Sequence, residues 1–207
     1  MFHYNRRYHK HEHGEGCNHD HDHDHSHNDK EEFKKDKVKV FPSKEQNQVT
    51  FVNFINLFPT AELPISLTSE TQRTMSEVQE PLSMVWAAHF LLYPDEEIDE
   101  YTEYMACFSL PKTDDFFAAI YWEANLYGNG YHMATFSKSG NLIDKVWLAG
   151  TKYTDKELLQ SVCTIESDWS MNIVEGRIDA ITNQIDTSRE PEHTYFQLTL
   201  DGQIAEI

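Results

Sequence analysis

Histidines at every second position are the most distinctive chemical feature of this 207-residue sequence. They form two neighbouring runs, separated by a short segment that contains one cysteine. Imidazole nitrogens bind Zn(II), Ni(II) and Cu(II), and several of them must converge on one ion to hold it. An extended chain sends alternate side chains to the same side, so a few residues can surround one ion. We therefore predict metal binding by His9, His11, His13, Cys17, His19, His21, His23, His25 and His27.

Aspartates alternate with the histidines of the second run, at Asp20, Asp22 and Asp24. These carboxylates lower the cost of bringing a dication close, so we expect the segment to buffer metal rather than to select one ion. A thiolate at Cys17 favours zinc or Cu(I), but a single cysteine does not define a structural zinc site. The choice among zinc, nickel and copper therefore stays open.

A calcium loop of the EF-hand type is the alternative metal site in this segment. Asp20, Asp22, Asp24 and Glu31 occupy positions 1, 3, 5 and 12 of such a loop. However, His25 stands where the loop needs a glycine for its sharp turn, and no apolar helix precedes the segment. Calcium specificity is therefore not favoured. An expression tag is not favoured either, because tags are usually unbroken histidine runs.

The segment HKHEHGEGCNHDHDHDHSH, residues 9–27, resembles the His-rich tails and loops of bacterial nickel and zinc chaperones and transporters. The resemblance is one of composition and is confined to this part of the chain. It implies metal storage or delivery and carries no catalytic residue over, because the GTP-binding loop of the nickel-chaperone GTPases is absent.

The composition of the sequence changes near residue 37. Residues 1–37 are mainly His, Asp, Glu, Lys and Asn, with too few apolar side chains to offset the entropy of ordering. From residue 38 onward aromatic and aliphatic residues recur at regular spacing. We therefore expect a disordered His-rich arm over residues 1–37 and a single acidic α+β domain over residues 38–207.

The negative charge of the chain lies in the predicted domain. Residues 38–207 contain 26 acidic and 10 basic side chains, a formal charge of −16, whereas residues 1–37 are nearly balanced. An acidic domain repels the phosphates of nucleic acids, so we expect no nucleic-acid partner. Metal ions and a basic protein are the partners that this charge favours.

Two helices are predicted at the start of the domain. Thr50 suits an N-cap, and Phe51, Phe54, Ile55 and Phe58 follow at helical spacing until Pro59 ends the pattern. An extended segment is expected over residues 62–68. A second helix is expected over residues 76–92, with Pro81 in its first turn and an apolar run behind it.

The remainder of the domain predicts an antiparallel β-meander of about six to eight strands, with the two helices packed on one face. Alternating or continuous apolar segments begin near residue 103 and recur to the end of the chain. Turns are indicated by Gly-Asn-Gly at 128–130, by Ser139-Gly140 and by Asp201-Gly202. Short connections of this kind join antiparallel neighbours.

The predicted domain offers no recognisable catalytic motif. It has no phosphate-binding glycine loop, no G-x-S-x-G, no H-E-x-x-H and no C-x-x-C. Its three histidines, His89, His132 and His193, fall in different elements, and we expect each to be structural rather than part of one site. His132 shares a strand face with Ala134 and Phe136.

Two functions of different classes follow. In the first, the chain is a metal-binding protein whose arm buffers or delivers zinc, nickel or copper. In the second, it is a small acidic protein-interaction module without enzymatic activity, such as an inhibitor, an immunity-like protein or an assembly factor. Neither function requires catalysis.

A cytoplasmic location is expected. Cys17, Cys107 and Cys163 are too few for a disulfide framework, which favours a reducing compartment. The N-terminal MFHYNRRYHK lacks the apolar run of a secretory signal, and no segment approaches the ~18 apolar residues of a membrane span. We therefore expect no membrane association.

Overall fold

The computed structural model describes residues 49–76, 79–97, 100–111, 113–154, 157–179, 182 and 184–207. All nine predicted metal ligands, and the boundary predicted near residue 37, lie outside these residues. The disorder of the arm therefore stays a prediction.

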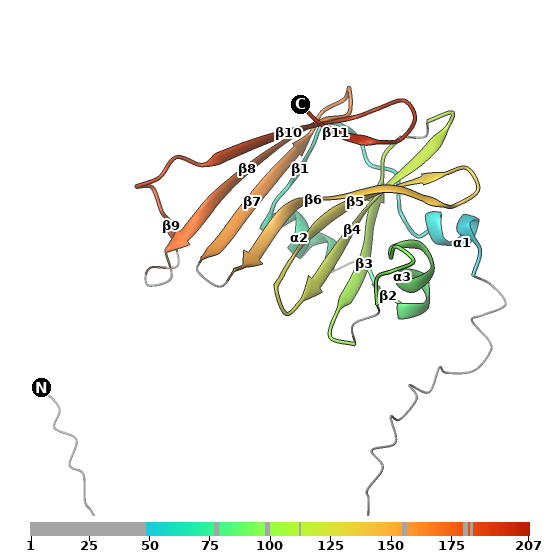
Figure 1. Cartoon of the computed structure of the whole chain (residues 1–207), viewed down its shortest axis with the longest axis horizontal. Helices are drawn as coiled ribbons and strands as arrows, with labels where there is room; N and C mark the ends of the chain where they lie inside the picture. Colours follow the sequence, from blue (N-terminus) through green and yellow to red (C-terminus); the bar gives the residue numbers. More distant parts are fainter. Residues whose placement is uncertain are drawn as a thin grey trace, which may run out of the picture. The chain divides into compact units, whose positions relative to one another are not determined.

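The described residues form a mostly antiparallel β fold with three short helices (Figure 1). The helices are α1 (Phe51–Ile55), α2 (Ser69–Ser76) and α3 (Met84–Phe90). The strands are β1 (Ile65–Leu67), β2 (Pro81–Leu82), β3 (Glu103–Ser109), β4 (Phe116–Asn125), β5 (Gly128–Ser137), β6 (Leu142–Tyr153), β7 (Leu158–Ile165), β8 (Ser170–Asp179), β9 (Gln184–Ile185), β10 (Glu192–Leu198) and β11 (Ile204–Glu206). This confirms the α+β class and the antiparallel meander.

The strands are joined in one sheet, in the order β11-β10-β8-β7-β6-β5-β4-β3-β2, with β1 beside β7 and β9 beside β8. The sheet has eleven strands, so the prediction of six to eight was wrong. The strands beyond the expected eight are β1, β2 and β9, each of two or three residues. Segments this short show no periodicity of hydrophobic residues that would predict a strand. β1 nevertheless lies within residues 62–68, which were expected to be extended.

The second predicted helix was placed too early in the sequence. Pro81 does not begin a helix but lies in β2, where it pairs with Met105 of β3. The helix α3 begins only at Met84, after Ser83. Proline lacks an N–H group and therefore suits the edge of a sheet as well as the first turn of a helix. The helix α2 was not predicted, because its residues are mostly polar.

The turn predicted at 128–130 lies two residues earlier. The hairpin turn between β4 and β5 is formed by Leu126 and Tyr127, and Gly128 already pairs with Asn125. The glycine at position 130 has a different role from that of a turn residue. A Cβ atom there would collide with the ring of Trp147 and with the carbonyl oxygen of Ala149. Gly130 therefore allows the Trp147 ring to lie across the backbone of β5.

The sheet has two halves, one from β2 to β6 and one from β7 to β11, and they diverge between β6 and β7. These strands pair only from Gly150 to Tyr153 of β6, and the second half of β7 pairs with β1 instead. At the other end of β6 the C-terminal hairpin returns, and the N–H of Ile204 donates to Asp144 Oδ2 (2.9 Å). The apolar space between the diverging halves is filled by one core cluster, which includes Phe116, Ile120, Met133, Leu148, Ile165 and Met171.

A second core cluster lies on the other face of β3, β4 and β5, beneath α1 and α3 (Figure 1). The alternation along β4 shows the two faces: Phe116, Ala118 and Ile120 belong to the first cluster, whereas Ala119 and Tyr121 belong to the second. The prediction that helices cover one face of the sheet is therefore confirmed for α1 and α3. By contrast, α2 contributes Met75 to the first cluster.

A buried hydroxyl fastens the C-terminal hairpin to β5. Thr135, which is fully buried, donates to the carbonyl oxygen of Gly202 (2.7 Å) and accepts from the N–H of Asp144 (3.1 Å). Replacing Thr135 with valine keeps the shape but leaves both backbone groups without this partner. We expect a loss of about 1–3 kcal/mol in the free energy of unfolding, measured by urea denaturation. Thr60→Val, at an exposed position, serves as the control, and an equal loss in both variants would contradict this role.

Candidate functional site

The predicted metal ligands lie outside the described residues, so the structure does not test them. Within the ranges that the structure describes, no group of three or more His, Cys, Asp and Glu side chains is arranged to hold a metal ion. The three histidines of the domain lie in separate environments. His89 contacts Phe90 on α3, His132 stacks on Tyr121 across β4 and β5, and His193 stacks on Tyr195 of β10.

His132 is the most unusual polar residue of the domain. Its ring is stacked on Tyr121 (centroids 5.1 Å apart) and meets the edge of Trp147 (5.0 Å). Its Nε2 atom is buried and has no hydrogen-bond partner among the described residues. Burial, together with the charges of the nearby Lys145 and Lys152, lowers the pKa of His132 to about 3. The imidazole is therefore neutral at physiological pH.

Glu123 is the nearest acid to this imidazole, with Oε2 3.7 Å from His132 Nε2. Burial also raises the pKa of Glu123, although Asn125 Nδ2 donates to its Oε1 at 2.9 Å. Burial thus favours the neutral form of both groups. The separation exceeds that of a hydrogen bond, so no proton is shared between them. His132 and Glu123 are thus two mostly buried polar side chains that are not hydrogen-bonded to each other.

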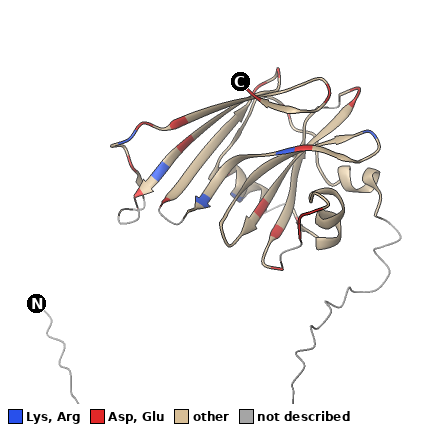
Figure 2. Cartoon of the chain, viewed as in Figure 1, with Lys and Arg blue, Asp and Glu red and all other residues tan. Residues whose placement is uncertain are grey.

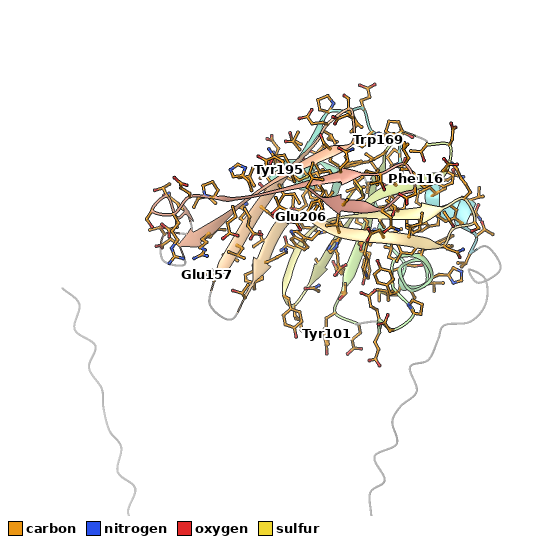
Figure 3. The ribbon with its side chains drawn as sticks, turned by 45° about the horizontal axis from the view of Figure 1, so that its top comes forward. Tyr101, Phe116, Glu157, Trp169, Tyr195 and Glu206 are labelled. Carbon is orange, nitrogen blue, oxygen red and sulfur yellow. The ribbon has the colours of Figure 1, made fainter. Side chains whose placement is uncertain are left out.

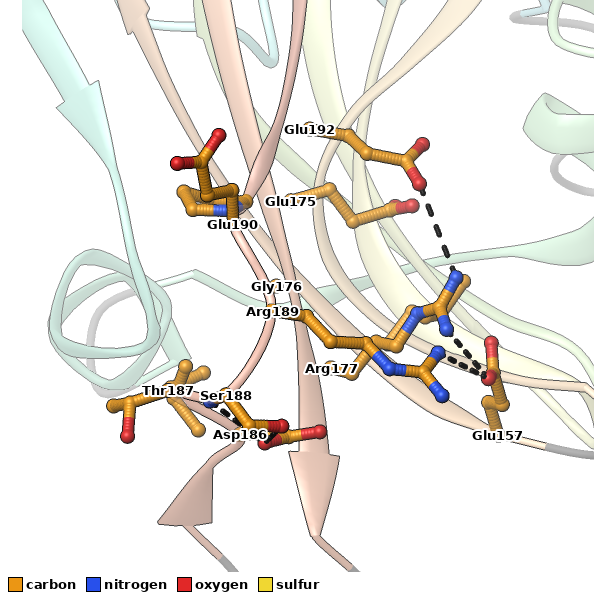
Figure 4. Close-up of a pocket in the computed structure, with 13 residues that line it drawn as sticks. Glu157, Glu175, Gly176, Arg177, Asp186, Thr187, Ser188, Arg189, Glu190 and Glu192 are labelled. Carbon is orange, nitrogen blue, oxygen red and sulfur yellow. Dashed lines mark hydrogen bonds and ion pairs between the residues drawn. The ribbon is translucent and has the colours of Figure 1, made fainter.

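A charged pocket of about 550 Å³ lies between the ends of β7, β8 and β10 (Figure 4). Arg177 and Arg189 converge there on one carboxylate: their Nη1 atoms lie 2.9 Å and 3.5 Å from Glu157 Oε1. Arg177 Nη2 also lies 3.9 Å from Glu192 Oε1. The apolar part of the lining is formed by Leu159, Ile185 and Pro191.

Carboxylates outnumber guanidinium groups in the charged pocket. Its acidic lining residues are Glu157, Glu175, Asp186, Glu190 and Glu192, and its basic ones are Arg177 and Arg189. Because the two arginines already face Glu157 and Glu192, the remaining charge of the pocket is negative. A cationic group is therefore the ligand that this lining would attract.

The sequence did not predict this pocket. Glu157, Arg177 and Arg189 are far apart in the chain, and only the pairing of Leu159 with Arg177 brings the first two together. No local pattern indicates that pairing. The acidic balance of residues 38–207 was the one available signal, and it does not locate a site.

The described helices are all short, and none is long and apolar enough to cross a membrane. No protein-family model matches the chain, and comparisons with curated proteins and with solved structures find no similar protein.

Proposed function

We propose that the chain is a metal-binding protein in which residues 9–27 bind Zn(II), Ni(II) or Cu(II) and buffer or deliver the ion. The observation that carries this proposal is the alternation of histidine at 19, 21, 23, 25 and 27, repeated at 9, 11 and 13. Several imidazoles within so few residues can converge on one ion, and intervening aspartates partly balance its charge.

The folded domain has no catalytic role in this proposal. Its two cysteines, Cys107 and Cys163, are free and buried, and burial raises the pKa of each thiol to about 12. Such thiols are poor nucleophiles and poor metal ligands at neutral pH, because the thiolate is the reactive form. Free buried cysteines also agree with the cytoplasmic location that we propose.

Isothermal titration of the full chain with ZnCl₂, NiCl₂ or CuCl₂ tests metal binding. We expect heat of binding from the unmodified chain and loss of most of the bound metal when His19, His21, His23, His25 and His27 are replaced by asparagine. The control variant carries His89→Gln and His193→Gln in the domain and should bind as the unmodified chain does. Absence of binding by the unmodified chain at neutral pH would refute the proposal.

The same titration should depend on pH in a defined range. A free imidazole with a pKa of ~6.5 is about nine-tenths protonated at pH 5.5, and a protonated imidazole cannot bind a metal. Bound metal should therefore be released as the pH falls from 7.5 to about 5.5. Metal that stays bound through this range would contradict the release expected of histidine ligands.

We propose docking to a basic protein as a second function, which agrees with an interaction module without enzymatic activity. Its support is the formal charge of −16 over residues 38–207 and the excess of carboxylates in the charged pocket. Association with a basic partner should weaken as salt is added, because salt screens exposed charges. Metal binding through imidazoles depends chiefly on pH, so the two functions respond to different conditions.

A further inference from the structure

Four large apolar side chains are exposed at one end of the sheet. Tyr101 is 63% exposed, Leu126 69%, Tyr127 76% and Tyr153 53%. We call these residues the tyrosine end. Tyr101 and Glu157 both lie at this end, on the side of the ribbon away from Phe116 and Trp169 (Figure 3). Contiguous apolar patches on the surface of a protein often mark a binding site.

The strand register places these four residues at the same end of the sheet. Glu103, the first residue of β3, pairs with Ala124, so Tyr101, two residues before the strand β3 begins, lies at the end of the sheet that carries the Leu126–Tyr127 turn. Gly128 pairs with Lys152, so Tyr153, the next residue of β6, lies beside Tyr127. The N–H of Tyr153 donates to the carbonyl oxygen of Tyr127 (2.8 Å). The tyrosine end therefore spans the ends of the neighbouring strands β3 to β6.

The charged pocket continues the same end of the sheet from β7 to β10. Tyr153 pairs with Leu158, which lies between the pocket residues Glu157 and Leu159. Acidic residues also lie on β3 and β4 toward this end, and Figure 2 shows them in red. Within the described part of the chain, neither Glu175 nor Glu190 forms an ion pair within 4.0 Å, although the charge of Glu175 acts on the nearby Lys152.

We propose that the tyrosine end and the charged pocket together bind a basic segment of a partner protein. Apolar residues of that segment pack on Tyr127 and Tyr153, and one of its Lys or Arg side chains enters the pocket beside Glu175 and Glu190. Tyrosine combines a large contact area with few rotatable bonds, and interface hot spots are accordingly rich in it. The acidic lining selects the charge of the occupant. This inference rests on the proposed docking function and locates its surface.

The charge part of the surface can be tested with a fluorescein-labelled peptide of equal parts Arg, Leu and Gly, its binding to the full chain followed by anisotropy. The double variant Glu175→Gln, Glu190→Gln should weaken binding at least about fivefold. The matched control is Asp114→Asn, Asp115→Asn, which removes the same charge from the exposed residues before β4, at the opposite end of that strand. Its affinity should stay within about twofold of the unmodified chain.

The apolar part of the surface is tested with Tyr127→Ser, Tyr153→Ser, which we expect to weaken peptide binding about tenfold. Leu200→Ser is the control, because Leu200 is 82% exposed in the turn between β10 and β11, away from the pocket end of β10. All seven substituted positions are exposed or line the charged pocket, and circular dichroism should show each variant folded.

The outcomes distinguish failure of the proposed surface from failure of the proposed docking function. Loss of binding in both surface variants, with both controls unchanged, supports the proposed surface. If Glu175→Gln, Glu190→Gln and Asp114→Asn, Asp115→Asn weaken binding equally, net charge alone explains binding and the proposed surface is wrong. The proposed surface is also wrong if the surface variants bind the peptide as the unmodified chain does. If the unmodified chain does not bind the peptide, the docking function itself fails.

Discussion

Replacing Phe54 with alanine should destabilise the folded domain by about 3–5 kcal/mol. Phe54 is fully buried, and its ring lies 4.6 Å from that of Phe90, 5.1 Å from Phe58 and 5.7 Å from Phe136. These rings come from α1, the segment after it, α3 and β5, so Phe54 joins both covering helices to the sheet. Alanine leaves a cavity that the neighbouring rings cannot readily fill, because α3, β5 and the segment after α1 hold these rings in place.

Urea denaturation of the full chain, followed by circular dichroism and tryptophan fluorescence, measures this loss. Val52→Ala on the same helix is the control, because Val52 is 64% exposed and should change the free energy of unfolding by less than about 0.5 kcal/mol. If the two variants lose similar amounts, the helix α1 is not fixed to the sheet through Phe54.

Acidification should destabilise the domain through His132. Its folded pKa of about 3 lies below its ordinary value of 6.5, so the unfolded chain binds the proton first as the pH falls. Stability from this group is therefore complete above pH 6.5 and is lost progressively as the pH falls toward 3. Between pH 7 and pH 4 the loss is about 3 kcal/mol. Glu123 acts in the opposite direction, because burial raises its pKa and protonation then favours the folded state.

The variant His132→Phe isolates this contribution. Phenylalanine keeps a ring between Tyr121 and Trp147 but cannot be protonated, so the free energy of unfolding should depend less on pH than in the unmodified chain. Urea denaturation gives, for each chain, the change in the free energy of unfolding between pH 7 and pH 4. The difference between these two changes is the contribution of His132. His193→Phe, at an exposed position, is the control. Identical pH profiles for the unmodified chain and His132→Phe would show that the buried imidazole is not responsible.

Local signals were sufficient to predict much of the fold. Thr50 caps α1, accepting from the N–H of Asn53, and the turns at Gly140 and Gly202 use glycines with positive φ. These features depend on a few adjacent residues, so they can be recognised without the rest of the chain. The placement of His132 on one face with Ala134 and Phe136 was also correct: His132 stacks on Tyr121, which belongs to the same core cluster as Ala134 and Phe136. Alternation along the strand is enough to predict this.

Features that depend on distant pairings were not predicted. The strand β2 exists because Pro81 and Leu82 find a partner in β3, and the sequence around them suits a helix equally well. The charged pocket requires β7, β8 and the segment before β10 to be aligned, which local patterns do not specify. The burial of His132 Nε2 without a partner likewise follows from packing by Tyr121 and Trp147.

The short strands at the margins of the sheet have a consequence for assembly. The order of strands ends at β2 with two residues, one of them a proline, and at β11 with three, and the side strands β1 and β9 are equally short. Such margins present few open N–H and C=O groups as a template for a further strand. Growth into fibrils by backbone pairing at β2 and β11 is thereby disfavoured.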